Sequence, residues 1–151
     1  MRAVIQRTLQ PAKVVVNDTV TGWIEKGFVV YLGIEDSDDM EDIQWLARKL
    51  VNLRIFNDQN DKMNLSLQDV NGSVLLISQF TLFASTKKGN RPSFLRSAKP
   101  EKANEIYQMF QEELLREYEI QVATGVFGAH MHVEYTNDGP VTIIIDTKEK
   151  Q

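Results

Sequence analysis

Two stretches of the chain carry apolar residues at the three- and four-residue spacing of an amphipathic helix. The first stretch follows an acidic segment, and we expect Ser37 or Asp38 to cap its start. In the second, Pro100 stands where the first turn of a helix tolerates proline. Both apolar stripes are predicted to face the core. They consist of Ile43, Leu46, Ala47, Leu50 and Val51 in the first helix, and Ala103, Ile106, Tyr107, Phe110 and Leu114 in the second.

Most of the remaining chain shows short apolar or alternating runs that are typical of strands, with turn residues between them. Short strands with only two helices favour a mixed α/β (α+β) fold, in which antiparallel-rich, barrel-like sheets carry two main helices on the outside. No internal repeat or linker interrupts the pattern, so residues 1–151 are predicted to form a single domain. The predicted strands are Ala3 to Arg7, Lys13 to Asn17, Thr21 to Glu25, Phe28 to Ile34, Leu53 to Phe56, Ser73 to Phe83, Gln121 to Val126, Met131 to Thr136 and Val141 to Thr147.

The overall composition, 42% hydrophobic and 25% charged, is that of an ordinary globular chain. The absence of cysteine excludes disulfides, thiolate zinc sites and a cysteine nucleophile. The first residues lack the apolar core of a signal peptide, and no run approaches the roughly 20 apolar residues that cross a bilayer. We therefore expect a cytoplasmic protein with no membrane partner.

Positive charge is concentrated in one segment. Between Ser85 and Lys102, six basic residues stand against one acid, which gives this segment +5; the whole chain carries −4, so the remainder carries −9. A basic loop on an acidic body suits a local phosphate contact. On charge alone, a solvated lysine-rich loop remains the simpler interpretation.

Two polar stretches interrupt the strand pattern. Ser78 to Thr81 ends the apolar run from Val74 to Ile77 with two hydroxyls and an amide, and such groups must find hydrogen-bond partners or a use. Asn137 to Thr142 places a Gly-Pro pair at the start of a strand, where proline removes a donor from the ladder. Taken separately, the first is well explained as the frayed end of a strand and the second as a hairpin turn.

The candidate nucleophiles have no obvious general base. A serine or threonine hydrolase needs a base beside its hydroxyl, and the only histidines, His130 and His132, are remote in sequence from Ser78 and Thr81. The two imidazoles are expected on one face of a strand, but without a third ligand they predict no metal site. No Walker or dinucleotide motif occurs, so no cofactor is predicted.

Considered together, the SQFTL stretch and the later NDGPVT stretch resemble the D-aminoacyl-tRNA deacylase (D-tyrosyl-tRNA deacylase) family. Further stretches are similar to that family in the same order: AVIQR near the start, RIFND…KMNLSL, RPSF and TGVFGAHM. The resemblance extends from Met1 to about Ile145, and the SQFT form resembles the standard branch of the family.

The resemblance implies a homodimeric, β-barrel-like α/β fold with two active sites at the subunit interface. It also implies chirality-based proofreading: hydrolysis of the ester between a D-amino acid, or glycine, and the 3′-terminal adenosine of tRNA, without a cofactor. Ser78, Gln79, Phe80 and Thr81 would line the catalytic pocket.

Other residues take roles from the same resemblance. Gly139 and Pro140 would form a cis peptide that enters the pocket of the partner subunit and rejects L-amino acids. Phe127 and Met131 would border the terminal adenine and the amino acid. His130 stands where the family is often acidic or variable, so no role is assigned to it.

The missing base has a chemical explanation if the substrate is an aminoacyl ester. The neighbouring 2′-OH of the terminal ribose can help to activate water, while the backbone N–H groups near Phe80 and Thr81 stabilise the oxyanion. We favour this route over Thr81 as a covalent nucleophile. In the basic segment, Lys87, Lys88 and Arg91 are the candidates for contacts with tRNA phosphates.

Three other interpretations stay open from the sequence. A non-catalytic, barrel-type RNA-binding module would use Phe80, Phe83 and the lysines as a stacking and phosphate surface. A small-ester hydrolase would use a threonine or serine nucleophile, which the missing base disfavours. The third is a purely structural dimer.

Overall fold

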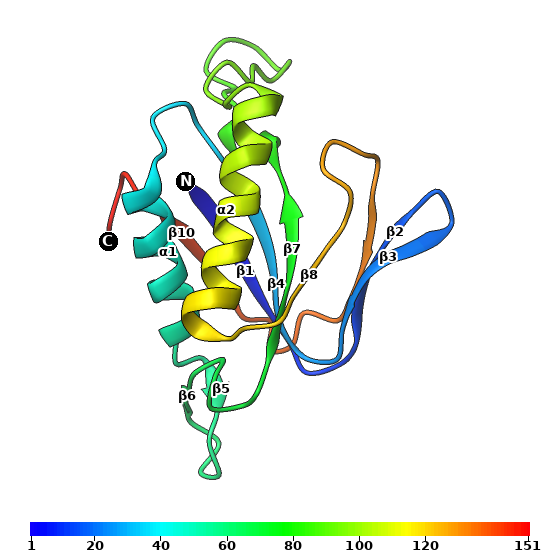
Figure 1. The fold of residues 1–151 in the computed structure, drawn as a ribbon, viewed down its shortest axis with the longest axis vertical. Helices are drawn as coiled ribbons and strands as arrows, with labels where there is room; N and C mark the ends of the chain where they lie inside the picture. The colour runs from blue at the N-terminus through cyan, green and yellow to red at the C-terminus, as the bar shows by residue number, and fades with distance from the viewer.

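A five-stranded mixed sheet forms the centre of the molecule in the computed structural model, which describes residues 1–151 (Figure 1). The strand order is β10-β1-β4-β7-β8. Strand β1 pairs antiparallel with β10 and β4, whereas β4, β7 and β8 run parallel to one another. The strands are β1 (Arg2–Thr8), β4 (Gly27–Gly33), β7 (Ser73–Ser78), β8 (Val122–Thr124) and β10 (Thr142–Asp146).

Two smaller antiparallel sheets complete the strand content. A three-stranded sheet has the order β3-β2-β9, and a short hairpin joins β5 to β6. The predicted mixed α/β class, rich in antiparallel pairs, is confirmed, although the sheets remain open and do not close into a barrel. The strands are β2 (Ala12–Val16), β3 (Thr19–Ile24), β5 (Phe56–Asn57), β6 (Met63–Leu65) and β9 (His132–Glu134).

Two helices, α1 (Met40–Asn52) and α2 (Pro100–Tyr118), lie side by side against one face of the central sheet (Figure 1). Alternation along β4 separates the two faces: Phe28, Val30 and Leu32 join the large core under the helices, while Val29 joins a smaller core. The three-stranded sheet covers that smaller core. Both predicted apolar stripes contribute to the large core, as expected.

The start of α1 differs from the prediction by one residue. The cap is Asp39, not Ser37 or Asp38: its carboxylate accepts the N–H of Asp42, and the Asp42 carboxylate accepts the N–H of Asp39 in return. Asp38 cannot serve because its side chain is buried and accepts the N–H of Glu35. Pro100 occupies the first turn of α2, as predicted.

The strand predicted from Ser73 to Phe83 is wrong in its second half. Strand β7 ends at Ser78, and Phe80–Phe83 form a single 3-10 turn, η1. Gln79 donates its N–H to Leu32 O at 2.8 Å, after which the chain leaves the sheet. The apolar pattern continued because Phe83 turns back into the interior and is buried.

The remaining strands follow the predictions closely, with one omission and one shift. Strand β6 was not predicted, and β5 begins at Phe56, where the predicted Leu53 to Phe56 strand ends. No helix of the structure is long and apolar enough to cross a membrane.

Candidate active site

A cavity of about 740 Å³ opens beside the end of β7. Its walls come from β4, the end of β7, the loop that leads into α2, and the loop between β8 and β9. The cavity brings together most of the pocket residues that the sequence predicted. They are Ser78, Gln79, Phe80, Phe127 and Met131, with His130 beside them.

The segment Gln79–Ala84, which we call the pocket turn, is tied to the end of β4. Besides the bond from Gln79 to Leu32 O, the turn closes on itself through N–H donation from Leu82 to Gln79 O at 3.3 Å and from Ala84 to Thr81 O at 3.0 Å. Arg2 also donates to Leu82 O at 2.8 Å. These bonds fix the backbone of the turn next to the cavity.

Gly33, at the end of β4, makes room for this turn. A Cβ at Gly33 would lie 3.1 Å from Gln79 O, and also 3.1 Å from the Cβ of Leu82 and from a ring carbon of Phe83. Such contacts are tighter than most side chains make, so a larger residue at this position would push the turn by a few tenths of an ångström.

The start of the turn offers free backbone donors. In a 3-10 turn the first N–H groups have no acceptor within the turn, and here these belong to Phe80 and Thr81. The Thr81 hydroxyl, by contrast, accepts a hydrogen bond from the Gln79 side-chain amide and has no basic partner. Thr81 is exposed and does not line the cavity, so only Ser78, Gln79 and Phe80 of the four predicted pocket residues do so. The Thr81 N–H nevertheless belongs to the peptide that joins it to Phe80, which lies in the cavity wall.

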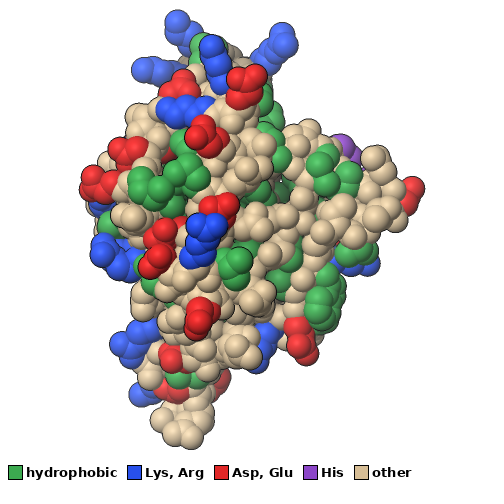
Figure 2. Space-filling model, in the orientation of Figure 1, with side chains coloured by type: hydrophobic (Ala, Val, Ile, Leu, Met, Phe, Trp, Pro, Cys, Tyr) green, Lys and Arg blue, Asp and Glu red, His purple; other side chains and the backbone are tan.

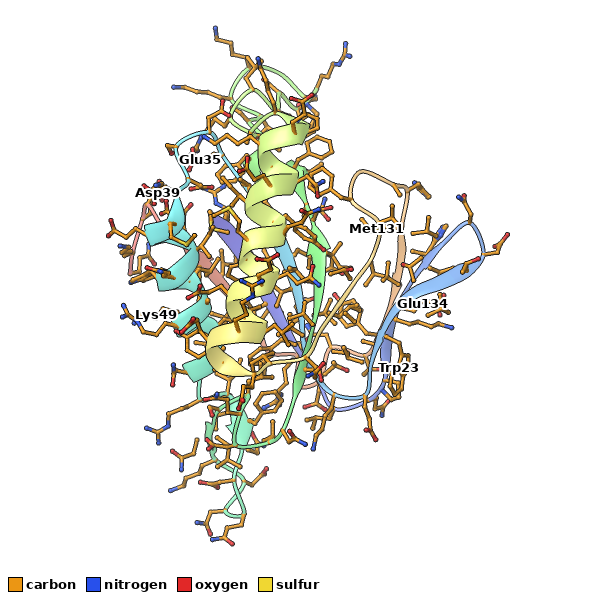
Figure 3. The ribbon with its side chains drawn as sticks, viewed as in Figure 1. Trp23, Glu35, Asp39, Lys49, Met131 and Glu134 are labelled. Carbon is orange, nitrogen blue, oxygen red and sulfur yellow. The ribbon has the colours of Figure 1, made fainter.

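Aromatic rings and a methionine form the apolar walls. Phe80 is 58% exposed and meets Phe94 edge to face, with ring centroids 5.0 Å apart. Phe127 packs on Tyr107, at 5.8 Å between centroids. Met131 lies on the segment between the central sheet and the β2–β3 hairpin (Figure 3). The exposed faces of these rings are suited to stacking against a base or another flat group.

The cavity lining includes His130 and Asp36, which are of a type that can act as a base, but neither forms a hydrogen bond with the Thr81 hydroxyl of the pocket turn. Tyr31 also lines the cavity, and burial together with the hydrogen bond to Tyr135 at 2.9 Å raises the pKa of Tyr31, so its hydroxyl stays protonated. His130 and His132 meet edge to face at 5.0 Å, although only His132 belongs to β9, and His130 lies in the preceding loop. No cluster of three or more His, Cys, Asp or Glu residues is arranged to hold a metal.

Gly139 and Pro140 lie outside this cavity, in the segment Asp138–Val141, which we call the Gly-Pro turn. The Gly139–Pro140 peptide bond is cis, and both residues are exposed. Arg7 holds the turn: Asp138 donates its N–H to Arg7 O at 2.9 Å, and Arg7 donates its N–H to Val141 O at 3.2 Å. The turn is thus presented to the outside, away from the cavity of its own chain.

Arg7, to which the sequence assigned no role, also supports the Gly-Pro turn through its side chain. Its buried guanidinium donates to Asp138 at 2.8 Å, to Ile55 O at 2.7 Å and to the Asn57 side chain at 3.1 Å. Its Nε has no partner. The available signal was a charged residue at an inward-facing position of β1, on the same side as Ile5.

Lys87, Lys88 and Arg91 also lie outside the cavity. All three are exposed in the loop between η1 and α2, whose two arms pair at Ser85 and Ser93. Figure 2 shows Lys and Arg side chains projecting from the end of the molecule where Figure 1 places this loop. The loop therefore adds a positively charged surface beside the cavity.

Comparison with known proteins shows full-length similarity. Residues 4–146 match the family described as D-Tyr-tRNA(Tyr) deacylase. The chain is 53% identical to a D-aminoacyl-tRNA deacylase of Flavobacterium psychrophilum over 151 residues, all of both chains. It is 54% identical to a protein of the same name from Fusobacterium nucleatum subsp. nucleatum over 149 residues, 99% of this chain and 97% of that one.

Solved structures extend the comparison to the fold. A structure described as c-Myc DNA Unwinding Element Binding Protein superimposes with a TM-score of 0.90 and 38% identity, covering 97% of this chain and 98% of that chain. A probable eukaryotic D-amino acid tRNA deacylase superimposes with a TM-score of 0.77 at 17% identity, covering 95% and 98%. The second likeness concerns the fold alone.

Proposed function

The chain belongs to the D-Tyr-tRNA(Tyr) deacylase family and is therefore a hydrolase of D-aminoacyl-tRNA, and we propose that it acts at the cavity beside β7. The bond cleaved is the ester between a D-amino acid, or glycine, and the 3′-terminal adenosine of tRNA. The observation that carries the proposal is the convergence of Ser78, Gln79, Phe80, Phe127 and Met131 on one cavity.

The proposed chemistry relies on the backbone and on the substrate. The N–H groups of Phe80 and Thr81 stabilise the oxyanion that develops when water attacks the ester carbonyl. The adjacent 2′-OH of the ribose helps to activate that water, which removes the need for a protein base. Two hydroxyls support this route: Tyr31 keeps its proton and so cannot act as the base, and the Thr81 hydroxyl, which accepts a hydrogen bond from the Gln79 side-chain amide, has no base beside it that would make it a nucleophile.

Discrimination between D and L isomers is assigned to the Gly-Pro turn of a second copy of the chain. A pocket cannot grasp a side chain that varies, whereas a rigid backbone wall can occupy the space of the L side chain. Gly139 and Pro140 are exposed and lie outside their own cavity, which supports their use by a partner. Glycine lacks a Cβ and passes the wall, so glycyl-tRNA is an expected substrate.

The homodimer that this arrangement requires has a candidate surface. The three-stranded sheet packs over Val29, Leu75 and Ile77 of the central sheet. Beside this covered region, Ile144 on the outer face of β10 is 68% exposed. A second copy covering this part of the sheet would bury that apolar surface. Light scattering after size exclusion is expected to give twice the mass of one chain; a monomer that is fully active would contradict the shared site.

Phosphate contacts are assigned to Lys87, Lys88 and Arg91. An enzyme that serves many tRNAs gains by holding the backbone without reading bases. The exposed positions of these side chains near the cavity support the assignment. The same chemistry predicts binding that weakens as salt rises.

The decisive experiment compares deacylation of D-Tyr-tRNA, L-Tyr-tRNA and Gly-tRNA by the purified protein. We expect turnover of the D and glycyl substrates and none of the L substrate. Equal turnover of D-Tyr-tRNA and L-Tyr-tRNA would contradict chiral selection. Binding of tRNA without any turnover would instead favour the RNA-binding module.

A second experiment separates the backbone route from a threonine nucleophile. Thr81→Ala is expected to retain much of the activity, while a tRNA ending in 2′-deoxyadenosine should react poorly. An inactive Thr81→Ala protein together with full turnover of the deoxy substrate would exclude the substrate-assisted route.

A further inference from the structure

The wall of the cavity contains a serine that belongs to neither polar stretch. The Ser97 hydroxyl donates a hydrogen bond to Phe80 O, with 2.7 Å between the oxygens. Ser97 is half-buried and lines the cavity together with Phe80. It therefore touches the pocket turn at the peptide that follows Phe80.

The backbone around Ser97 is fixed to the residues that directly follow β4, the strand that anchors the pocket turn. Ser97 forms an antiparallel bridge with Glu35, and the next residue, Ala98, donates its N–H to Ile34 O at 2.9 Å. Gln79, at the start of the turn, donates its N–H to Leu32 O at 2.8 Å. The segments that carry the Ser97 hydroxyl and the Phe80 carbonyl are therefore both held by hydrogen bonds to the chain at the end of β4 or directly after it.

Phe80 O and Thr81 N–H belong to one peptide group. Because a peptide is planar and its C=O and N–H point in opposite directions, holding the oxygen also sets the direction of the N–H. Donation to the carbonyl also polarises the group, since hydrogen bonds in a chain strengthen one another. A hydroxyl on Phe80 O therefore affects both the aim and the donor strength of Thr81 N–H.

We infer that Ser97 is a positioning residue for deacylation, which orients and polarises the Phe80–Thr81 peptide so that Thr81 N–H can stabilise the oxyanion. The inference rests on the proposed function, because it deepens the role given there to this N–H. Ser97 itself takes no part in bond making or breaking.

The test uses two variants of matched shape. Ser97→Thr keeps the hydroxyl and Ser97→Val replaces it with a methyl group, so the pair differs in the hydrogen bond alone. We expect kcat for D-Tyr-tRNA to be about tenfold lower in Ser97→Val than in Ser97→Thr, which is less than the roughly 10²–10³ lost with a direct oxyanion donor. KM should agree within about twofold, because phosphate contacts rather than this bond hold the tRNA.

Further variants keep the result interpretable. Ser97→Ala is expected to behave like Ser97→Val, which covers the case in which valine does not fit. Ser93→Ala, in the same loop and exposed, should match the wild type. Equal kcat in the threonine, valine and alanine variants would overturn the inference, as would a change confined to KM.

A spectroscopic readout separates this inference from the proposed function. The amide nitrogen shift of Thr81 responds to hydrogen bonding at Phe80 O, so it should move in Ser97→Val and stay near the wild-type value in Ser97→Thr. A Thr81 signal that is the same in both variants would overturn the inference even in an active enzyme. Absence of D-selective turnover by the wild type, with the shift present, would instead contradict the proposed function.

Discussion

The pocket turn and the Gly-Pro turn are both short segments held by backbone hydrogen bonds, yet their supports are arranged differently. The pocket turn is held by several residues, among them Leu32, Ser97 and Arg2. The Gly-Pro turn depends on Arg7, whose backbone and guanidinium both bind it. Distributed support tolerates the loss of one contact, whereas concentrated support does not.

The largest effect is therefore expected at Arg7. Arg7→Met removes a buried cation and leaves Ile55 O and the Asn57 side chain without their donor, at a cost of about 3 kcal/mol in the free energy of unfolding. Urea denaturation measures this cost. Asp138 is 38% exposed at its side chain, so Asp138→Asn is the matched control and should cost less than about 1 kcal/mol. Equal losses in the two variants would show that support is not concentrated at Arg7.

The next effect concerns the Gly-Pro turn itself. A Cβ at Gly139, where φ is +117°, would lie 2.8 Å from a methyl carbon of Val141 and 2.9 Å from its nitrogen. Gly139→Ala should shift the turn and lower the ratio of D-Tyr-tRNA to L-Tyr-tRNA turnover by about 100-fold, since the strain and clash together exceed about 2 kcal/mol.

Gly89→Ala is the control for that substitution. Gly89 has φ of +76° but no atom within 4 Å of the added Cβ, so it carries the backbone strain without the clash. Its D-to-L ratio should equal that of the wild type. An unchanged ratio in Gly139→Ala as well would remove the turn from chiral selection.

A smaller effect is expected at Gly33, which supports the pocket turn. The new Cβ would press on Gln79 O and Leu82 at 3.1 Å, and the turn must move by a few tenths of an ångström. Gly33→Ala should lower kcat by roughly tenfold, with about 1–2 kcal/mol of destabilisation from overpacking. If kcat stayed at the wild-type value while stability fell, the position of the turn would not matter for catalysis.

The smallest effect is expected at Lys87 and Lys88, whose side chains form no bond to either turn. Lys87→Glu with Lys88→Glu should raise the KM for tRNA by roughly tenfold at low salt, with kcat and the D-to-L ratio unchanged. Lys62→Glu, an exposed residue at the tip of the β5–β6 segment, is the charge control. Because Lys62→Glu changes the net charge half as much, an equal rise in KM per replaced lysine would make the effect one of net charge.

The sequence predicted those features that repeat. The helical stripes followed from apolar residues at a spacing of three or four, and most strands followed from apolar residues at every second position, because burial of one face imposes a period on the chain. The end of β7 was missed because Phe83 continues the apolar pattern after the chain has left the sheet. The cap at Asp39 was missed by one residue, because several acids in that segment are equally suitable. Asp38 is excluded only by its bonds to the N–H of Glu35 and to the chain's N-terminal amine.

The site was predictable only where a motif marks it. The resemblance named Ser78 to Thr81, Phe127 and Met131, and all of these except Thr81 line one cavity. Ser97 and Arg7 act through backbone carbonyl groups, which impose no residue type and leave no spacing in the sequence. Tyr31 of β4 bonds to Tyr135, which directly follows β9, and this contact depends on tertiary packing rather than on local pattern.

The free N–H groups at the start of the pocket turn have a consequence for how this protein can lose its activity by mutation. A main-chain donor survives every substitution at its own position except one by proline, which has no N–H. On the proposed chemistry, a saturation library at Thr81 would tolerate most amino acids and select strongly against proline alone. Inactivating mutations would instead accumulate at positions such as Gly33, which touch no substrate but decide where those donors point.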